Sequence, residues 1–191
     1  LFYTKGAGYY EQFKARAKFA DYHLSDITIG SEVIKRTDLI RRKYLDNQFY
    51  GAVWSLDYEG GNQINGTLGG GLSKYDGDHF GEVIWAKYAS NGAINHRYYD
   101  NRSSKSDFNL YGKLNYDFTQ NWNVFLDLQY RNVGFEMLGT SDVLENLDFN
   151  NSWNFFNPKI GLTHTFSSNT LAYFSFAKGT KEPNRSDFVD S

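Results

Sequence analysis

The clearest pattern along the chain is an alternation of apolar and polar residues with a period of two. In residues 107–118 the even positions are Phe, Leu, Gly, Leu, Tyr and Phe, while the odd positions are mostly polar. This spacing is typical of a β-strand whose two faces meet different surroundings. The alternation recurs in residues 49–59, 63–73, 122–130 and 156–166, and 171–178 is aromatic on both faces. Residues 1–13 are expected to end a further strand, with either more strand or a short helix over 11–20. We therefore predict about seven strands.

The connections between these strands alternate between short and long. Short turns are predicted at 60–62, 119–121 and 167–169, where Gly, Asn, Ser and Thr cluster. Long polar segments lie between the resulting hairpins, at 14–48, 74–106 and 131–154, and another starts at Gly179. A compact soluble domain rarely contains several structureless loops longer than about 15 residues. The pattern predicts an all-β, antiparallel up-and-down meander with long external loops, as in a transmembrane β-barrel.

The two predicted faces differ in chemistry in the way that such a barrel requires. One face is aliphatic and aromatic with almost no charge, and the other carries Asp, Asn, Lys and Thr. A large barrel turns the first face to lipid and the second to its lumen. Aromatic rings gather beside the predicted short turns, where we expect an interfacial girdle at headgroup depth. The girdle residues are Tyr58, Phe118, Trp122 and Phe166.

Composition narrows the possible classes further. The 191 residues include 35 aromatic side chains and no cysteine, which excludes disulfide scaffolds, Cys-zinc sites and thiol nucleophiles. A net charge of −2 provides no basic field for nucleic acid. The mean hydropathy of −0.60 resembles that of a soluble protein. A polar lumen and polar loops that dilute a lipid-facing stripe explain this value equally well. Both ends look cut, so we expect one partial barrel domain over 1–191 that is truncated at each end.

Candidate binding residues lie in the predicted long loops. Arg41 and Arg42 are expected either to contact anionic groups of a ligand or of lipopolysaccharide, or to be solvated loop charges. Loop aromatic residues either stack on sugar rings or a siderophore, or pack the loops together. These aromatic candidates are Trp85, Tyr88, Tyr98, Tyr99 and Trp153.

Other kinds of site find little support in the sequence. No nucleophile, base and acid stand in a recognisable arrangement, so an enzyme is not expected, and neither is a cofactor. The four histidines are scattered, and no metal site is predicted. The glycines in 66–71 follow no phosphate-binding pattern. They indicate curvature, a bulge or the close approach of another element, such as a plug.

At this point the residues resemble a known family. Residues 173–188, YFSFAKGTKEPNRSDF, are similar to a barrel strand of TonB-dependent outer-membrane receptors that runs into an external loop. Residues 5–13 and 40–51 resemble other strand-to-loop junctions of the same family, in its Bacteroidetes-type form. The resemblance implies a 22-stranded barrel in the outer membrane of a Gram-negative bacterium, with a plug domain and a TonB-binding box that are not visible in this chain.

The resemblance also implies a function and partners. The expected function is active uptake of a scarce nutrient, which is a siderophore, cobalamin or an oligosaccharide, with the long loops at the ligand entrance. The expected partners are outer-membrane lipid, the receptor's own plug domain, TonB and a surface glycan-binding lipoprotein. Two other functions stay open: a soluble β-sandwich that binds carbohydrate, and a passive outer-membrane porin.

Overall fold

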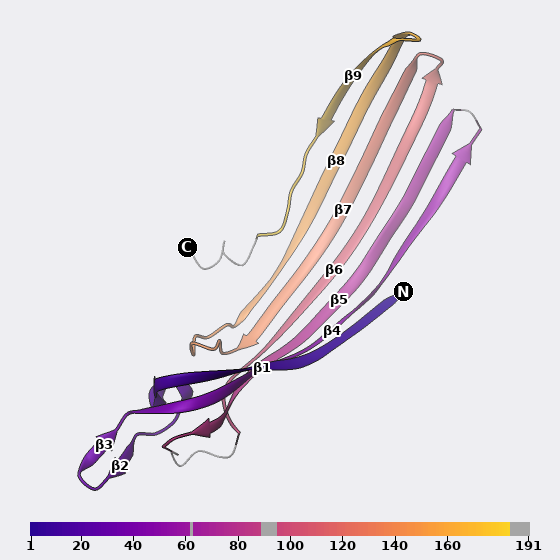
Figure 1. Ribbon diagram of the computed structural model, residues 1–191. Coiled ribbons are helices and arrows are strands. Elements are labelled where there is room, and N and C mark those ends of the chain that lie inside the picture. Colours follow the sequence, from indigo (N-terminus) through magenta and orange to yellow (C-terminus); the bar gives the residue numbers. More distant parts are fainter. Residues whose placement is uncertain (62, 89–94, 184–191) are drawn as a thin grey trace.

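The computed structural model describes residues 1–61, 63–88 and 95–183, and its fold is all-β. Seven strands form one antiparallel sheet in the order β1-β4-β5-β6-β7-β8-β9 (Figure 1). The chain passes up and down through neighbouring strands, which confirms the predicted meander. The strands are β1 (Phe2–Lys18), β2 (Ile27–Ile29), β3 (Glu32–Ile34), β4 (Arg36–Gly60), β5 (Ile64–Ala86), β6 (His96–Thr119), β7 (Trp122–Gly139), β8 (Phe149–Ser167) and β9 (Thr170–Ala177).

The three short turns lie together at one end of the sheet, as predicted (Figure 1). We call this the turn end and the opposite end the loop end. Asn62 of the first turn lies outside the described residues. At the loop end a short 3-10 helix, η1 (Phe19–Tyr22), and the β2–β3 hairpin join β1 to β4. No helix in the described part of the chain is long and apolar enough to cross a membrane.

The predicted extents of the long loops were wrong. The connections span residues 19–35, 87–95 and 140–148, because the strands continue far into the segments predicted as loops. In these extensions polar residues occur on both faces and apolar residues do not alternate regularly with them. Asp76, Asp78 and Arg102, for example, lie in paired strand positions, while Leu39 and Val83 are buried. Backbone pairing does not require apolar side chains, so the ladder continues where the apolar alternation stops. Alternation detected only the part of each strand that has an apolar face.

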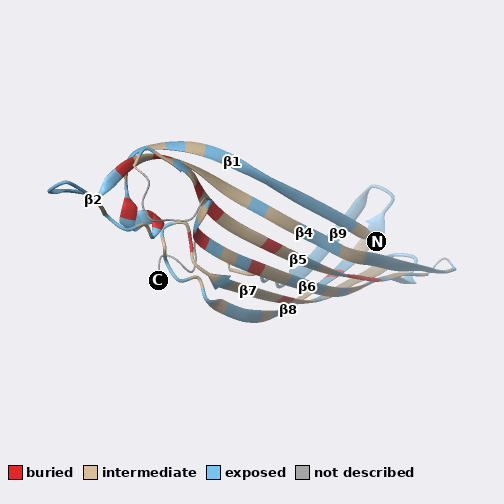
Figure 2. Cartoon of the chain, turned by 90° about the horizontal axis from the view of Figure 1, so that it is seen from below, coloured by how far each residue is buried: buried red, intermediate tan, exposed pale blue. Residues whose placement is uncertain are grey.

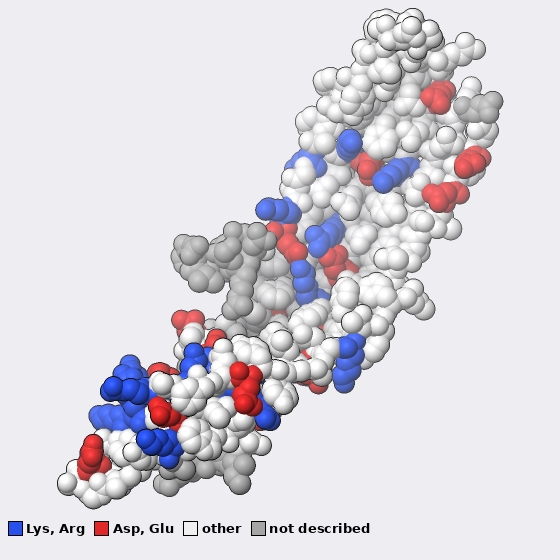
Figure 3. All heavy atoms as spheres, viewed as in Figure 1, with Lys and Arg blue, Asp and Glu red and all other residues white. Residues whose placement is uncertain are grey.

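The register of the sheet separates the two faces clearly. On the apolar face Leu56 pairs with Leu68, which pairs with Gly112, and Leu114 pairs with Leu126. On the polar face one row of paired positions crosses five strands and consists of Asp57, Thr67, Lys113, Asp127 and Lys159. Figure 3 shows charged side chains of both signs spread over the sheet and densest near the loop end.

Pairing with β8 also decides which way the aromatic strand β9 faces. Phe174 and Phe176 pair with Leu162 and Ile160 and share the apolar face. Tyr173 pairs with Thr163 on the polar face.

The apolar face has the height of a membrane layer. Its continuous apolar stretch is about 9–11 residues long in each central strand, which corresponds to roughly 30–36 Å of strand. At the tilt of about 45° that is typical of membrane barrels, this stretch spans about 25 Å. Tyr58, Phe118, Trp122 and Phe166 border it at the turn end, and a second set borders it on the other side. The second set is Tyr50, Phe108, Tyr130 and Phe156, all exposed on the same face.

Two neighbouring rings explain glycines of β5 without a second domain. A Cβ at Gly69 would lie 2.4 Å from the Tyr111 hydroxyl, and one at Gly70 would lie 2.6 Å from the Asn109 carbonyl oxygen and 3.3 Å from the Trp54 ring. Each aromatic side chain therefore lies across a glycine of the adjacent strand. Contact between the glycines in residues 66–71 and a plug stays a prediction.

Few residues of the sheet are buried (Figure 2). The buried aliphatic and aromatic side chains lie toward the loop end, and the residues buried in the middle of the sheet, such as Gly69, Gly70 and Gly71, are glycines. In the described residues the second sheet consists only of the β2–β3 hairpin, and the large aliphatic and aromatic side chains of the apolar face are exposed. A soluble β-sandwich buries such a face against another sheet. The described sheet lacks that covering layer.

We predict that Leu114→Lys destabilises the folded protein in a lipid bilayer by about 2–4 kcal/mol, because the side chain points into the middle of the apolar layer. The measurement is the free energy of unfolding of the full protein in liposomes during denaturant titration. Asn115→Lys is the matched control, since it introduces the same charge one residue later on the polar face. Equal losses for the two variants would contradict the assignment of the faces.

Candidate functional site

A cavity of about 530 Å³ opens at the loop end, between β1, the start of β4 and the β7–β8 connection. We call it the vestibule. Five basic and two acidic side chains contribute to its lining, so positive charge dominates. The lining residues are Lys14, Ala15, Arg16, Ala17, Lys18, Asp21, Tyr22, Arg36, Arg41, Asp142, Val143 and Leu144.

A bulge in β1 shapes one wall of the vestibule. The pairing register between β1 and β4 shifts between Lys14 and Ala17, and Arg16 adopts a φ of 50°. This left-handed conformation is unfavourable for a residue with a side chain. It is held by its surroundings: the Arg16 amide donates to Asp38 Oδ1 at 2.8 Å, and Arg36 Nη1 donates to the Arg16 carbonyl at 3.0 Å.

A small tyrosine-rich core supports the other wall. The rings of Tyr22 and Tyr98 lie 4.7 Å apart, and those of Tyr98 and Tyr99 lie 5.0 Å apart. Leu39 and Val83 pack into the same cluster. Burial raises the pKa of Tyr22 and Tyr98, and it raises the pKa of Tyr99 to about 12. All three phenols are therefore neutral at physiological pH.

Arg41 is held between this core and β1. Its Nε and Nη2 donate to Gln12 Oε1 at 3.2 and 2.9 Å. Its Nη1 donates to the hydroxyl oxygens of Tyr22 and Tyr98 at 3.4 and 3.3 Å. Among the described residues no carboxylate lies within 4 Å of Arg41. The guanidinium is thus fixed by neutral acceptors, and its charge is not cancelled by a close ion pair.

The β7–β8 connection is tied to the sheet by an ion pair. Lys43 Nζ bonds to Asp142 Oδ2, which fastens the connection to β4 across the polar face. The hydrogen bond from Lys43, helped by the charge of Arg41, holds the pKa of Asp142 below its usual range. The bridge therefore stabilises the connection above about pH 4 and is lost only as the pH falls through the lowered pKa.

The two predicted arginines lie on opposite faces. Arg41 and Arg42 belong to β4 rather than to a loop, which corrects their predicted placement. Consecutive residues of a strand point to opposite sides. Arg42 lies over the Tyr9 ring at 4.5 Å and pairs with Glu11 at 2.9 Å, away from the vestibule. Only Arg41 lines the cavity.

Four of the predicted aromatic residues also lie in strands rather than loops. Tyr98 and Tyr99 of β6 are only 2% and 7% exposed, so in this structure they pack the loop end and present no face to a ligand. Trp85 of β5 is 48% exposed. Trp153 of β8 lies on the polar face, paired with Val133, and stacks near Phe149 with ring centres 6.3 Å apart.

Tyr88 alone of the aromatic candidates lies in a connection, just after β5, where Lys87 Nζ is 5.7 Å from the centre of its ring. Its amide donates to Thr37 Oγ1 at 2.9 Å. Trp85, Tyr88 and Trp153 are therefore spread over different strands and connections, and none of them lines the vestibule.

Sequence reasoning missed several residues of this site. Gln12, Tyr22 and Asp142 come from three separate segments, and no local pattern connects them. Lys43 was detectable, because a period of two places it on the same face as Arg41. Within the described ranges no three His, Asp or Glu side chains are close enough to hold a metal ion.

Comparison with known proteins shows which family this chain belongs to. The family model for the TonB dependent receptor-like β-barrel matches residues 2–190. The chain belongs to this family. No curated protein matches the sequence. Barrels of this family are outer-membrane receptors and transporters of Gram-negative bacteria. In membrane barrels the short turns face the periplasm and the loops face outward. The vestibule of this TonB-dependent receptor lies at the end of the sheet that carries the longer connections, opposite the three short turns.

We predict that Asp142→Asn speeds amide hydrogen exchange in residues 140–148 of the receptor about tenfold. The substitution removes a charge-assisted bond, which contributes roughly 1.5–3 kcal/mol, and the connection opens more often. The control is Glu145→Gln, which makes the same charge change in the same connection without touching Lys43. Unchanged exchange in Asp142→Asn would show that the ion pair does not hold the connection.

Proposed function

We propose that this chain forms the ligand-facing part of a receptor that takes up a scarce anionic nutrient across the outer membrane of a Gram-negative bacterium. Uptake is active and uses energy transmitted by TonB to a plug domain in the same receptor. Family membership supports the transport role, since these barrels are receptors and transporters. The vestibule supplies the preference for an anion.

The observation that carries the proposal is the state of Arg41. The partners of Arg41 are neutral, so its positive charge is not cancelled, and a fixed guanidinium attracts carboxylate and phosphate groups. Lys14, Arg16 and Arg36 line the same cavity and add positive charge around it. Positive charges along the vestibule also speed the capture of a negatively charged ligand at low salt.

This chemistry favours negatively charged nutrients over neutral ones. A siderophore with carboxylate or phenolate groups and an acidic oligosaccharide both suit the vestibule better than a neutral glycan does. Trp153 and Phe149, whose rings stack on one another, lie on the same polar face. An origin in a Bacteroidetes species and a glycan-binding lipoprotein partner remain parts of the proposal that rest on resemblance in the sequence.

The competing functions fit the structure less well. A soluble carbohydrate-binding β-sandwich requires a second sheet over the apolar face, and the described residues provide none. A passive porin lacks the plug and the energy coupling that are general in the family to which the chain belongs.

We predict that Arg41→Gln lowers the affinity of the receptor for its nutrient about tenfold or more, because one charge-assisted contact is lost. The measurement is uptake by cells that carry the full receptor, tested on anionic siderophores, acidic and neutral oligosaccharides, and cobalamin. Arg42→Gln is the control, since it removes the same charge from the adjacent residue on the opposite face, and uptake should be unchanged.

Two results would contradict the proposal. One is uptake of neutral compounds alone, and the other is equal uptake by the Arg41→Gln and Arg42→Gln cells.

A further inference from the structure

The segment after β9, residues 178–183, crosses the polar face of the sheet. We call it the strap. Its first contact explains why the ladder ends here: the Lys178 amide donates to the Pro158 carbonyl at 3.0 Å. Proline has no N–H to return to the Lys178 carbonyl, so the next antiparallel bond is missing. The last residue pair between β8 and β9 is Lys159 with Ala177, and the strap leaves the sheet from there.

Side chains, rather than a strand ladder, hold the strap on the polar face. Asn157 Oδ1 accepts from the amide and from the hydroxyl of Thr180, both at 2.7 Å. Asn157 Nδ2 donates to the Thr180 carbonyl at 3.4 Å. Further along, Glu182 Oε1 bonds to Lys105 Nζ at 2.8 Å and lies 3.6 Å from Arg131 Nη2. The strap therefore runs from the β8 side of the face to β6 and β7.

The two cations that meet Glu182 belong to the wall of the barrel. Lys105 pairs in register with Phe135 and Arg131 with Asn109, which places both side chains on the polar face. Arg131 is fixed by Asp107, which accepts from its Nε at 2.9 Å and also from Nη2. Within the described part of the chain, Glu182 is the only carboxylate within 4 Å of Lys105. Without Glu182 the cluster retains one uncompensated positive charge.

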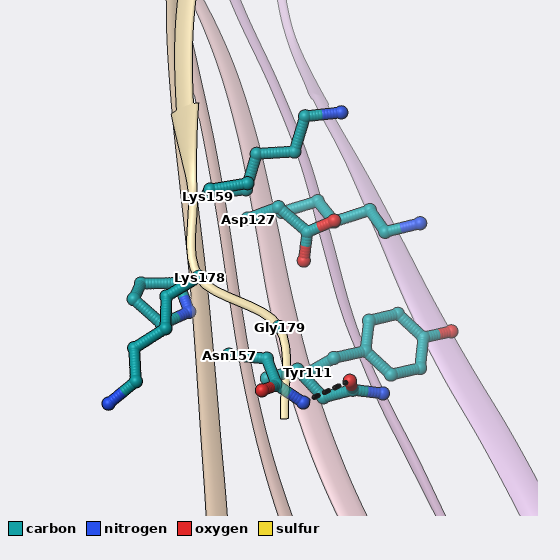
Figure 4. A pocket seen from close by; sticks show the side chains of 10 residues that line it. Tyr111, Asp127, Asn157, Lys159, Lys178 and Gly179 are labelled. Carbon is teal, nitrogen blue, oxygen red and sulfur yellow. Dashed lines mark hydrogen bonds between the residues drawn. The ribbon is translucent and has the colours of Figure 1, made fainter. Parts of the chain in front are cut away.

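The cluster lies on the route from the vestibule into the barrel. Arg41 pairs with Val83 and Lys105 with Tyr75, eight residues nearer the turn end on β5, or about 26 Å along the strand. A cavity of about 410 Å³ lies where the strap begins. Figure 4 shows Lys159, Asp127 and Tyr111 extending away from the strap on one side, while Lys178 points to the other.

We propose that Lys105 and Arg131 form a second anion-binding subsite in the lumen. The carboxylate of Glu182 occupies this subsite when no ligand is bound. The carboxylate or phosphate group of an incoming ligand displaces Glu182 and frees the strap. All four charged side chains are partly exposed, and such ion pairs contribute little to stability. A ligand anion can therefore replace Glu182 at low cost, while Asp107 keeps Arg131 in position. The inference rests on the proposed uptake of an anionic nutrient and places a second contact for it.

The experiment compares binding and strap mobility in the purified full receptor. The probes are radiolabelled succinate for carboxylates and inorganic phosphate for phosphates, measured by equilibrium dialysis. Glu182→Gln should tighten binding of at least one probe about two- to fivefold, since the internal competitor is removed and a partly exposed ion pair is weak. Lys105→Gln should weaken probe binding to a similar extent. In the double variant, Glu182→Gln should restore little of the probe binding that Lys105→Gln removes.

Amide hydrogen exchange in residues 178–183 provides the second readout. Exchange should increase when the probe is added to the wild-type receptor, and it should increase without any probe in Glu182→Gln. The controls are Glu136→Gln and Lys74→Gln, which remove the same charges elsewhere in the sheet and should change neither readout. Probe affinities that Glu182→Gln leaves unchanged would overturn the subsite. Strap exchange that stays the same in Glu182→Gln would overturn the displacement.

Failure of this inference can be told apart from failure of the proposed function. If Arg41→Gln abolishes nutrient uptake while Glu182→Gln changes neither readout, the vestibule stands and the second subsite is wrong. If Glu182→Gln tightens probe binding and frees the strap while Arg41→Gln transports normally, the subsite stands and the role of the vestibule is wrong.

Discussion

The structure depends above all on the requirement that backbone polar groups find partners inside the protein where no water reaches them. Within the apolar layer this requirement dictates a continuous ladder from β1 to β9 and leaves the side chains free to differ on the two faces. The same ladder continues beyond the layer, where water would satisfy the backbone equally well. The strands of this receptor therefore form one continuous curved sheet from the short turns to the vestibule.

The sequence was informative wherever a side chain reports directly on its surroundings. Alternation of Leu110, Leu114 and Leu126 with polar neighbours identified the strands that face lipid, and glycine- and asparagine-rich turns located the hairpins. Beyond the apolar layer polar residues occur on both faces of a strand, and the few buried residues, such as Leu39 and Val83, are not regularly spaced. Residues such as Asp76 and Ser104 therefore carry no periodic signal. The segments 36–48 and 74–86 therefore read as loops although they are paired strands.

The site was less accessible to sequence reasoning, because it depends on register and on irregular features. Arg41 was recognised as a basic residue, but its separation from Arg42 follows only once the segment is known to be a strand. Tyr98 was predicted to lie in a loop, either stacking on a ligand or packing the loops together, and it lies in a strand at the centre of a buried cluster. Three irregular features depend on contacts between residues that lie far apart in the chain. They are the bulge at Arg16, the bridge from Lys43 to Asp142, and the end of the β8–β9 ladder at Pro158.

The strands that carry the vestibule share one hydrogen-bonding register with the membrane wall, and this limits how the receptor can diverge. A single-residue insertion between Arg41 and the apolar layer would shift the side chains of one of these two regions to the opposite face of the sheet, since every following side chain changes face. The β2–β3 hairpin is not part of the ladder and tolerates changes in length. Related receptors with new ligand preferences are therefore expected to differ by point substitutions along the strands and by insertions at the tips of the connections.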